Sequence, residues 1–164
     1  MAYLDIKIIG PQPTARRGDV QDRTSSSSTG TLKVGEPIKK SGNYYVRCAD
    51  GEPTNAAPMA GIVSVESTET ATADGVVEFF PVVAGVTVMR ARATTPANID
   101  TAAELLGVKG DSICFDLSSS TFTIDEDEGD DPNVHGLLVI GGDIAKGTLD
   151  FVAKGYAVEA TSSY

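Results

Sequence analysis

Short runs of alternating apolar and polar residues recur along most of the chain and predict a β-rich protein. The longest run covers residues 75–94, where an almost continuously apolar segment is followed by an alternating one. Pro81 and Gly85 interrupt this run. Because proline lacks the amide donor of a strand ladder, the interruption predicts two strands rather than one. Further strands are expected near residues 32–34, 44–48, 61–68, 111–117, 121–124, 137–140 and 148–158.

Only residues 99–107 carry a good helical signal. Thr101 and Glu104 have the spacing of a capping box, in which each side chain accepts a hydrogen bond from the other residue's backbone amide. Gly107 suits the C-terminal cap. Many short strands and one short helix predict a mainly β fold: a small β-barrel or sandwich body with one short helix and an extended N-terminal arm.

The first 31 residues differ in pattern from the rest. Residues 3–9 alternate, with Leu4, Ile6 and Ile8 on one side, as in a half-buried strand that adds to a sheet of its own body or of a neighbour. Residues 10–31 show no apolar period and contain four consecutive serines. We therefore divide the chain into an arm (1–31) that orders against a partner and a β-rich body (32–164). Without residues 1–30 the body is expected to fold.

Charge is unevenly distributed along the chain. The formal net charge is -10, yet residues 1–40 hold seven basic and four acidic residues, and the remaining 124 hold six and nineteen. The acidic total argues against general affinity for nucleic acid or an anionic membrane. No signal peptide and no membrane-spanning run is recognisable, which favours synthesis in the cytoplasm. The basic leader is expected to dock on a charged surface, although chance can also produce such an imbalance over a short window.

The sequence offers little catalytic or metal-binding chemistry. The acidic run 125–131 lacks the ligand spacing of an EF-hand, which leaves a solvated loop as the favoured interpretation and a different calcium site as the alternative. His135 is the only histidine, and no serine lies in a nucleophile-elbow context. Cys48 and Cys114 form no metal-binding motif and are expected to be buried or half-buried free thiols in a reducing compartment. We predict no enzyme activity, no cofactor and no metal site.

The organisation of residues 60–155 provides a resemblance. The stretch EFFPVVAGVTVMRARATTPANIDTAAELLG, followed by GDSICFDLSSSTFTIDEDEGDDPNVHGLLVIGGDIAKGTLDFV, resembles the capsid decoration (cement) proteins of tailed bacteriophages. Shared features are an extended leader, a strand like VVEFFPVVAGVTVMRA, a short helical connector, a hairpin and a closing strand. The resemblance implies a small β-barrel or β-tulip body that forms dimers or trimers. It also implies a structural virion protein that binds the outer surface of the head and bridges neighbouring major capsid proteins.

Candidate contact residues follow from this resemblance. Capsid binding is assigned to the arm, through Leu4, Ile6, Ile8, Arg16, Arg17 and Arg23. Self-association is assigned to Phe79, Phe80, Arg90 and Arg92, although the two arginines also fit a plain solvated face. The major capsid protein and further copies of this chain are the expected partners, with no nucleic acid and no membrane.

Two other functions remain open at this stage. A carbohydrate- or receptor-binding β-module of a phage tail or fibre would use exposed aromatic rings, for which Tyr44 and Tyr45 are candidates. A small hydrolase would need His135 as its base.

Overall fold

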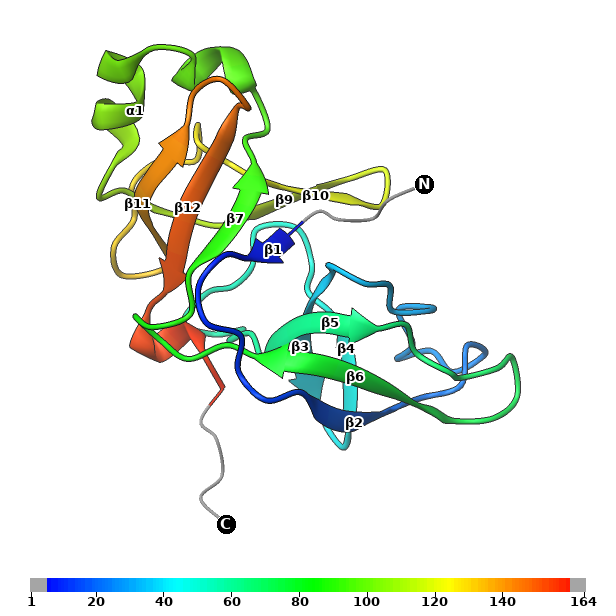
Figure 1. The fold of residues 1–164 in the computed structure, drawn as a ribbon. Helices are drawn as coiled ribbons and strands as arrows, with labels where there is room; N and C mark the ends of the chain where they lie inside the picture. The colour runs from blue at the N-terminus through cyan, green and yellow to red at the C-terminus, as the bar shows by residue number, and fades with distance from the viewer. Residues whose placement is uncertain (1–5, 160–164) are drawn as a thin grey trace.

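The computed structural model describes residues 6–159 and confirms a mainly β fold. Two five-stranded antiparallel sheets and a two-stranded hairpin are accompanied by one short α-helix (Figure 1). The strands are β1 (Ile6–Ile8), β2 (Arg16–Val20), β3 (Pro37–Ser41), β4 (Tyr44–Arg47), β5 (Gly61–Val65), β6 (Gly75–Pro81), β7 (Met89–Arg92), β8 (Ser112–Ile113), β9 (Phe115–Ser118), β10 (Thr121–Ile124), β11 (Leu137–Asp143) and β12 (Thr148–Ala153).

The first sheet has the order β1-β7-β12-β11-β8 and covers the larger core. Its inner face packs against hairpin β9–β10, against Met59 and against Ile62 of β5 in the second sheet. Phe151 of β12 meets Phe115 of β9 edge-to-face, with ring centroids 5.7 Å apart. Phe115 meets Phe122 of β10 in the same manner at 6.0 Å. Few aromatic residues are present, and these three join the sheet to the hairpin.

The second sheet has the order β2-β6-β5-β3-β4 and encloses a smaller core. Its two edge strands approach each other. A Cβ atom on Gly18 of β2 would lie 2.2 Å from the ring of Tyr45 on β4, so only glycine allows this ring to lie across the neighbouring strand. The sheet therefore curls toward a barrel.

The apolar stretch 75–94 connects the two sheets. Its first half is β6 in the second sheet, and its second half is β7 in the first sheet (Figure 1). Pro81 is the last residue of β6, and Gly85 in the connection has a φ of 69°. The predicted interruption is confirmed. At this interruption the chain passes from the second sheet to the first, which the alternation alone does not show.

The N-terminal segment is built into both sheets. Strand β1 pairs antiparallel with β7, and β2 pairs antiparallel with β6. Ile6 and Val20 are 2% and 3% exposed, each in one of the two cores. The predicted arm that orders only against a partner is thus corrected for the described residues, because the chain's own edges provide its hydrogen-bonding partners. Deletion of residues 1–30 would remove β1 and β2 from the two sheets, so the expectation that the body folds without them stays a prediction to be tested.

The predicted capping box is present at helix α1 (Ala102–Val108). The Thr101 side chain accepts from the Glu104 amide, and the Glu104 side chain accepts from the Thr101 amide. The predicted cap at Gly107 is wrong, because the helix runs on to Val108 and Lys109 is the C-cap. Among residues 6–159, no helix is long and apolar enough to cross a membrane.

Candidate functional site

The apolar residues assigned to capsid contact lie mostly inside the protein. Ile6 is 2% exposed in the larger core, and Ile8 packs against the same core. The assignment of these two side chains to a partner surface is therefore corrected, since the alternation of β1 turns them toward the chain's own interior. Leu4 lies outside the described residues.

The arginines of the same segment are more accessible. Arg16 is half-buried, whereas Arg17 and Arg23 are exposed. The Arg17 side chain is 78% exposed and lies 3.5 Å from a Glu78 carboxylate oxygen. An exposed pair at this distance contributes little to stability. The side chains of Arg17 and Arg23 are therefore accessible to another molecule.

The two phenylalanines assigned to self-association differ in their surroundings. Phe79 is 3% exposed, and its ring packs against Tyr45 with centroids 4.8 Å apart. It belongs to the smaller core, so its assignment to a subunit contact is corrected. Phe80 points to the other side of β6, is half-buried and lines a hollow that also contains Ile8.

A group of positive side chains lies on the outer face of the first sheet. Met89 and Ala91 of β7 are buried, which turns Arg90 and Arg92 outward, as the alternation predicts. Lys7 of β1 stands directly opposite Arg90. Lys146 from the β11–β12 turn lines the same hollow of about 370 Å³. We call Lys7, Arg90, Arg92 and Lys146 the basic strip.

The members of the basic strip differ in their ion pairs. Arg90 donates two hydrogen bonds to Asp150 on β12, at 2.6 and 2.9 Å. These hydrogen bonds raise the pKa of Arg90 and offset the like-charged Lys7 across the strand pair. Lys146 lies 3.4 Å from Asp143. Among residues 6–159, Lys7 and Arg92 form no ion pair with an acidic side chain.

The acidic run 125–131 uses several of its carboxylates to hold its own loop. Asp125 accepts hydrogen bonds from the amides of Asp127 and Glu128, at 3.1 Å each. Asp130 accepts from the amide of Ser112 at 2.8 Å. Glu126 is turned inward, 6% exposed, and accepts from the amide of Thr95 at 2.9 Å. These carboxylates therefore accept hydrogen bonds from separate backbone amides, and the loop is ordered, with Glu126 turned inward where the sequence favoured a solvated loop.

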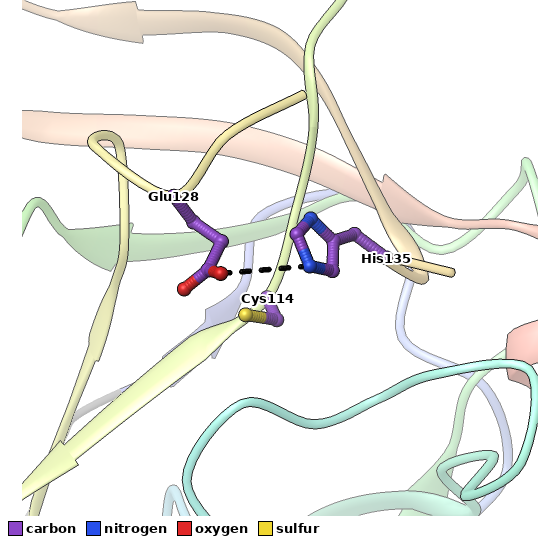
Figure 2. A group of neighbouring side chains, drawn as sticks. All are labelled: Cys114, Glu128 and His135. Atoms are coloured by element: carbon purple, nitrogen blue, oxygen red, sulfur yellow. Dashed lines mark ion pairs between the residues drawn. The ribbon is translucent and has the colours of Figure 1, made fainter. Parts of the chain in front are cut away.

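One carboxylate of the run takes part in a different arrangement. Cys114, Glu128 and His135 bring one sulfur, one oxygen and one nitrogen atom within 4.8 Å of one another (Figure 2). Cys114 lies between β8 and β9, Glu128 in the acidic run, and His135 just before β11. In the part of the chain that the structure describes, this is the only such group of three potential metal ligands. No metal site is predicted from the sequence, in which these three residues form no motif.

Burial and neighbouring charges shape this cluster. Cys114 is 1% exposed, and desolvation together with nearby carboxylates, Glu128 first among them, raises its thiol pKa to about 12. Glu128 lies 3.6 Å from Nε2 of His135. Nδ1 of His135 is 3.1 Å from the carbonyl oxygen of Ser112. The thiol is therefore neutral at physiological pH unless a cation replaces its proton.

The residues named for the two alternative functions have other contacts. The Tyr44 hydroxyl donates to Asp74 at 2.9 Å, and the ring of Tyr45 packs on Phe79. Both tyrosines are half-buried. His135 has Glu128 and the Ser112 carbonyl as its neighbours rather than a serine hydroxyl.

Sequence reasoning found some of these residues and missed others. The alternation of β7 was enough to place Arg90 and Arg92 outward. The alternation of residues 3–9 places Lys7 on the side opposite Ile6 and Ile8, but nothing in the sequence shows that β1 pairs with β7. Cys114, Glu128 and His135 are separated by 14 and 7 positions and match no ligand motif. Only the packing of the acidic loop against β8 and β9 brings them together.

Comparison with known proteins adds no relative: no protein-family model, curated protein or solved structure matches the chain.

Proposed function

We propose that this chain is a structural protein of a tailed-bacteriophage particle, which binds the outer surface of the head and bridges neighbouring major capsid proteins. Its role is binding, without turnover. The order of elements supports this proposal: an N-terminal leader, strands at 75–81 and 89–92, a short helix, a hairpin and a closing strand. This is the organisation in which the sequence resembles capsid decoration proteins.

The observation that carries the proposal is the grouping of exposed positive charge on an otherwise acidic protein. The basic strip lies on one outer face, and the exposed Arg17 and Arg23 belong to the N-terminal segment. The chain as a whole has a formal net charge of -10. Segregated charge of this kind favours docking on a complementary acidic surface. No comparable feature supports a sugar-binding module, because Tyr44 and Tyr45 have contacts within the chain.

We assign the two groups of positive charge to different contacts. Arg17 and Arg23 contact the major capsid protein, since they are the accessible side chains of the leader. The basic strip contacts a second copy of this chain in a dimer or trimer, because residues 41–164 of that copy carry the excess of negative charge.

Reversing charge at Arg17 and Arg23 is expected to weaken head binding. In co-sedimentation with preassembled heads of the cognate phage, the unmodified chain should bind saturably. The Arg17→Glu/Arg23→Glu variant should bind roughly tenfold more weakly, because it removes attraction without disturbing a core. Lys109→Glu, an exposed charge reversal at the end of α1, is the matched control and should bind like the unmodified chain. Failure of the unmodified chain to sediment with heads would refute the proposal.

Charge reversal in the basic strip is expected to affect self-association instead. Lys7→Glu/Arg92→Glu leaves the Arg90–Asp150 hydrogen bonds in place. Sedimentation velocity should show the unmodified chain as a dimer or trimer and this variant shifted toward monomer, by roughly tenfold in the dissociation constant. Lys109→Glu again serves as the control. An unchanged distribution in the double variant would contradict the assignment of the strip.

A further inference from the structure

We propose that Cys114, Glu128 and His135 bind a zinc ion, which fixes the acidic loop to the junction of β8 and β9. This inference is independent of the proposed capsid function. It concerns a site on the described part of the chain whose three residues come from separate segments (Figure 2).

The set of donor atoms selects the metal. A thiolate, an imidazole nitrogen and a carboxylate oxygen are the three ligand types that zinc accepts, whereas calcium and magnesium take oxygen ligands. Three protein ligands leave the fourth tetrahedral position to water. The Glu128 side chain is 40% exposed, so the site is open to solvent on that side. An ion can therefore enter without unfolding of the loop.

The distances require only small adjustments. Zinc lies about 2.0–2.3 Å from such ligands, which places tetrahedral donors roughly 3.5 Å apart. A carboxylate oxygen of Glu128 already lies 3.6 Å from Nε2 of His135. The remaining separations are at most 4.8 Å, so a closure of about 1 Å completes the geometry. The half-exposed side chain of Glu128 provides that movement, because no core packing restrains it.

The hydrogen bonding of His135 orients its Nε2 toward the cluster. A backbone carbonyl only accepts hydrogen bonds, so the contact of Nδ1 with the Ser112 oxygen at 3.1 Å places a proton on Nδ1. In the neutral ring, the Nε2 lone pair then faces a carboxylate oxygen of Glu128. Either a proton on Nε2 or a metal ion between the two atoms makes this contact favourable, and a metal ion can also reach the Cys114 sulfur. A carbonyl that orients the ring through Nδ1 is also the usual outer partner of a metal-binding histidine.

The supporting structure holds the ligands in place. Cys114 is buried, and its carbonyl accepts from the Asp125 amide at 3.1 Å. The carbonyl of His135 accepts from the Tyr156 hydroxyl at 2.8 Å. The Glu128 amide donates to Asp125, as described above. Burial favours the protonated thiol of Cys114. The positive charge of a bound zinc ion would stabilise the thiolate instead, because a coordinating thiol is deprotonated.

Metal titration of the reduced full chain tests the site. Calorimetry with Zn²⁺ should show one ion per chain. Co²⁺ should give thiolate-to-cobalt charge-transfer absorption together with the visible bands of a tetrahedral ion. Cys114→Ser should abolish the charge-transfer absorption, and Glu128→Gln should weaken binding by at least about tenfold.

Two matched controls accompany these variants. Cys48→Ser alters the other buried thiol, which lies outside the cluster. Asp127→Asn removes a neighbouring charge of the acidic run, whose side chain accepts from Asn98. Both should bind like the unmodified chain. If Cys114→Ser does not fold, the exposed Glu128→Gln and the His135→Gln variant still decide the question.

Three outcomes would contradict the proposal. The proposal is overturned if the unmodified chain shows no saturable binding of either metal. It is also overturned if Glu128→Gln and His135→Gln bind as tightly as the unmodified chain. Equal weakening by Asp127→Asn and Glu128→Gln would mean that the ion is attracted by the acidic run as a whole, and it would refute a site built on Cys114 and His135.

Discussion

A chain that begins at residue 21 is expected to lose its cooperative fold. The truncation removes β1 from the first sheet and β2 from the second, and with them Ile6 and Val20 from the two cores. Burial of each of these two side chains contributes about 1.5–3 kcal/mol. Lost strand pairing adds to this, in a protein whose total stability is on the order of 5–15 kcal/mol. Near-ultraviolet circular dichroism and urea unfolding should show loss of native packing.

The full chain with Lys7→Ala and Arg17→Ala is the control for this truncation. It removes outward-facing charges from the same two strands and keeps the buried residues. Its free energy of unfolding should change by less than about 0.5 kcal/mol per site. A truncated chain that unfolds cooperatively and as late as the full chain would show that the N-terminal segment is an independent arm after all.

Phe151→Ala is expected to lower the free energy of unfolding by about 3–5 kcal/mol. Phe151 is 0% exposed and meets Phe115 edge-to-face across the interior of the larger core. Removal of its ring leaves a cavity between the first sheet and hairpin β9–β10, and rigid sheets close such a cavity only partly. Urea titration followed by circular dichroism measures the loss.

Two comparisons make the Phe151 result specific. Phe151→Leu keeps most of the apolar volume and should cost clearly less. Phe80→Ala removes a ring that is half-buried beside β1, and it should also cost less than Phe151→Ala. A Phe151→Ala variant within about 1 kcal/mol of the unmodified chain would contradict the central role of this aromatic group.

Local patterns predicted the elements that depend on neighbouring residues. Alternation identified β7 and correctly oriented Met89 and Arg90, because successive strand residues point to opposite faces. The capping box of α1 was predictable, since both of its hydrogen bonds join residues three positions apart. Burial of both cysteines is also confirmed. These features need no information about the rest of the chain.

The N-terminal segment shows where local patterns fail. Strand β2 contains Arg16, Arg17, Gly18 and Asp19, which carry no apolar alternation. It is a strand because the edge of β6 offers unpaired backbone groups and because Gly18 leaves space for the ring of Tyr45. Strand β3 (Pro37–Ser41) is absent from the predicted strands for a similar reason, since its two lysines break the apolar alternation although the strand pairs with β5.

By itself, the sequence determined the β class, the capped helix, the outward direction of Arg90 and Arg92 and the acidic character of the body. Each depends on residue type and on neighbours within a few positions. Only the tertiary structure decided that the leader belongs to both sheets, that Phe79 is a core residue, and that Lys7 joins the basic strip. It alone brought Cys114, Glu128 and His135 together. These arrangements depend on pairing between strands far apart in the chain, which local alternation does not specify.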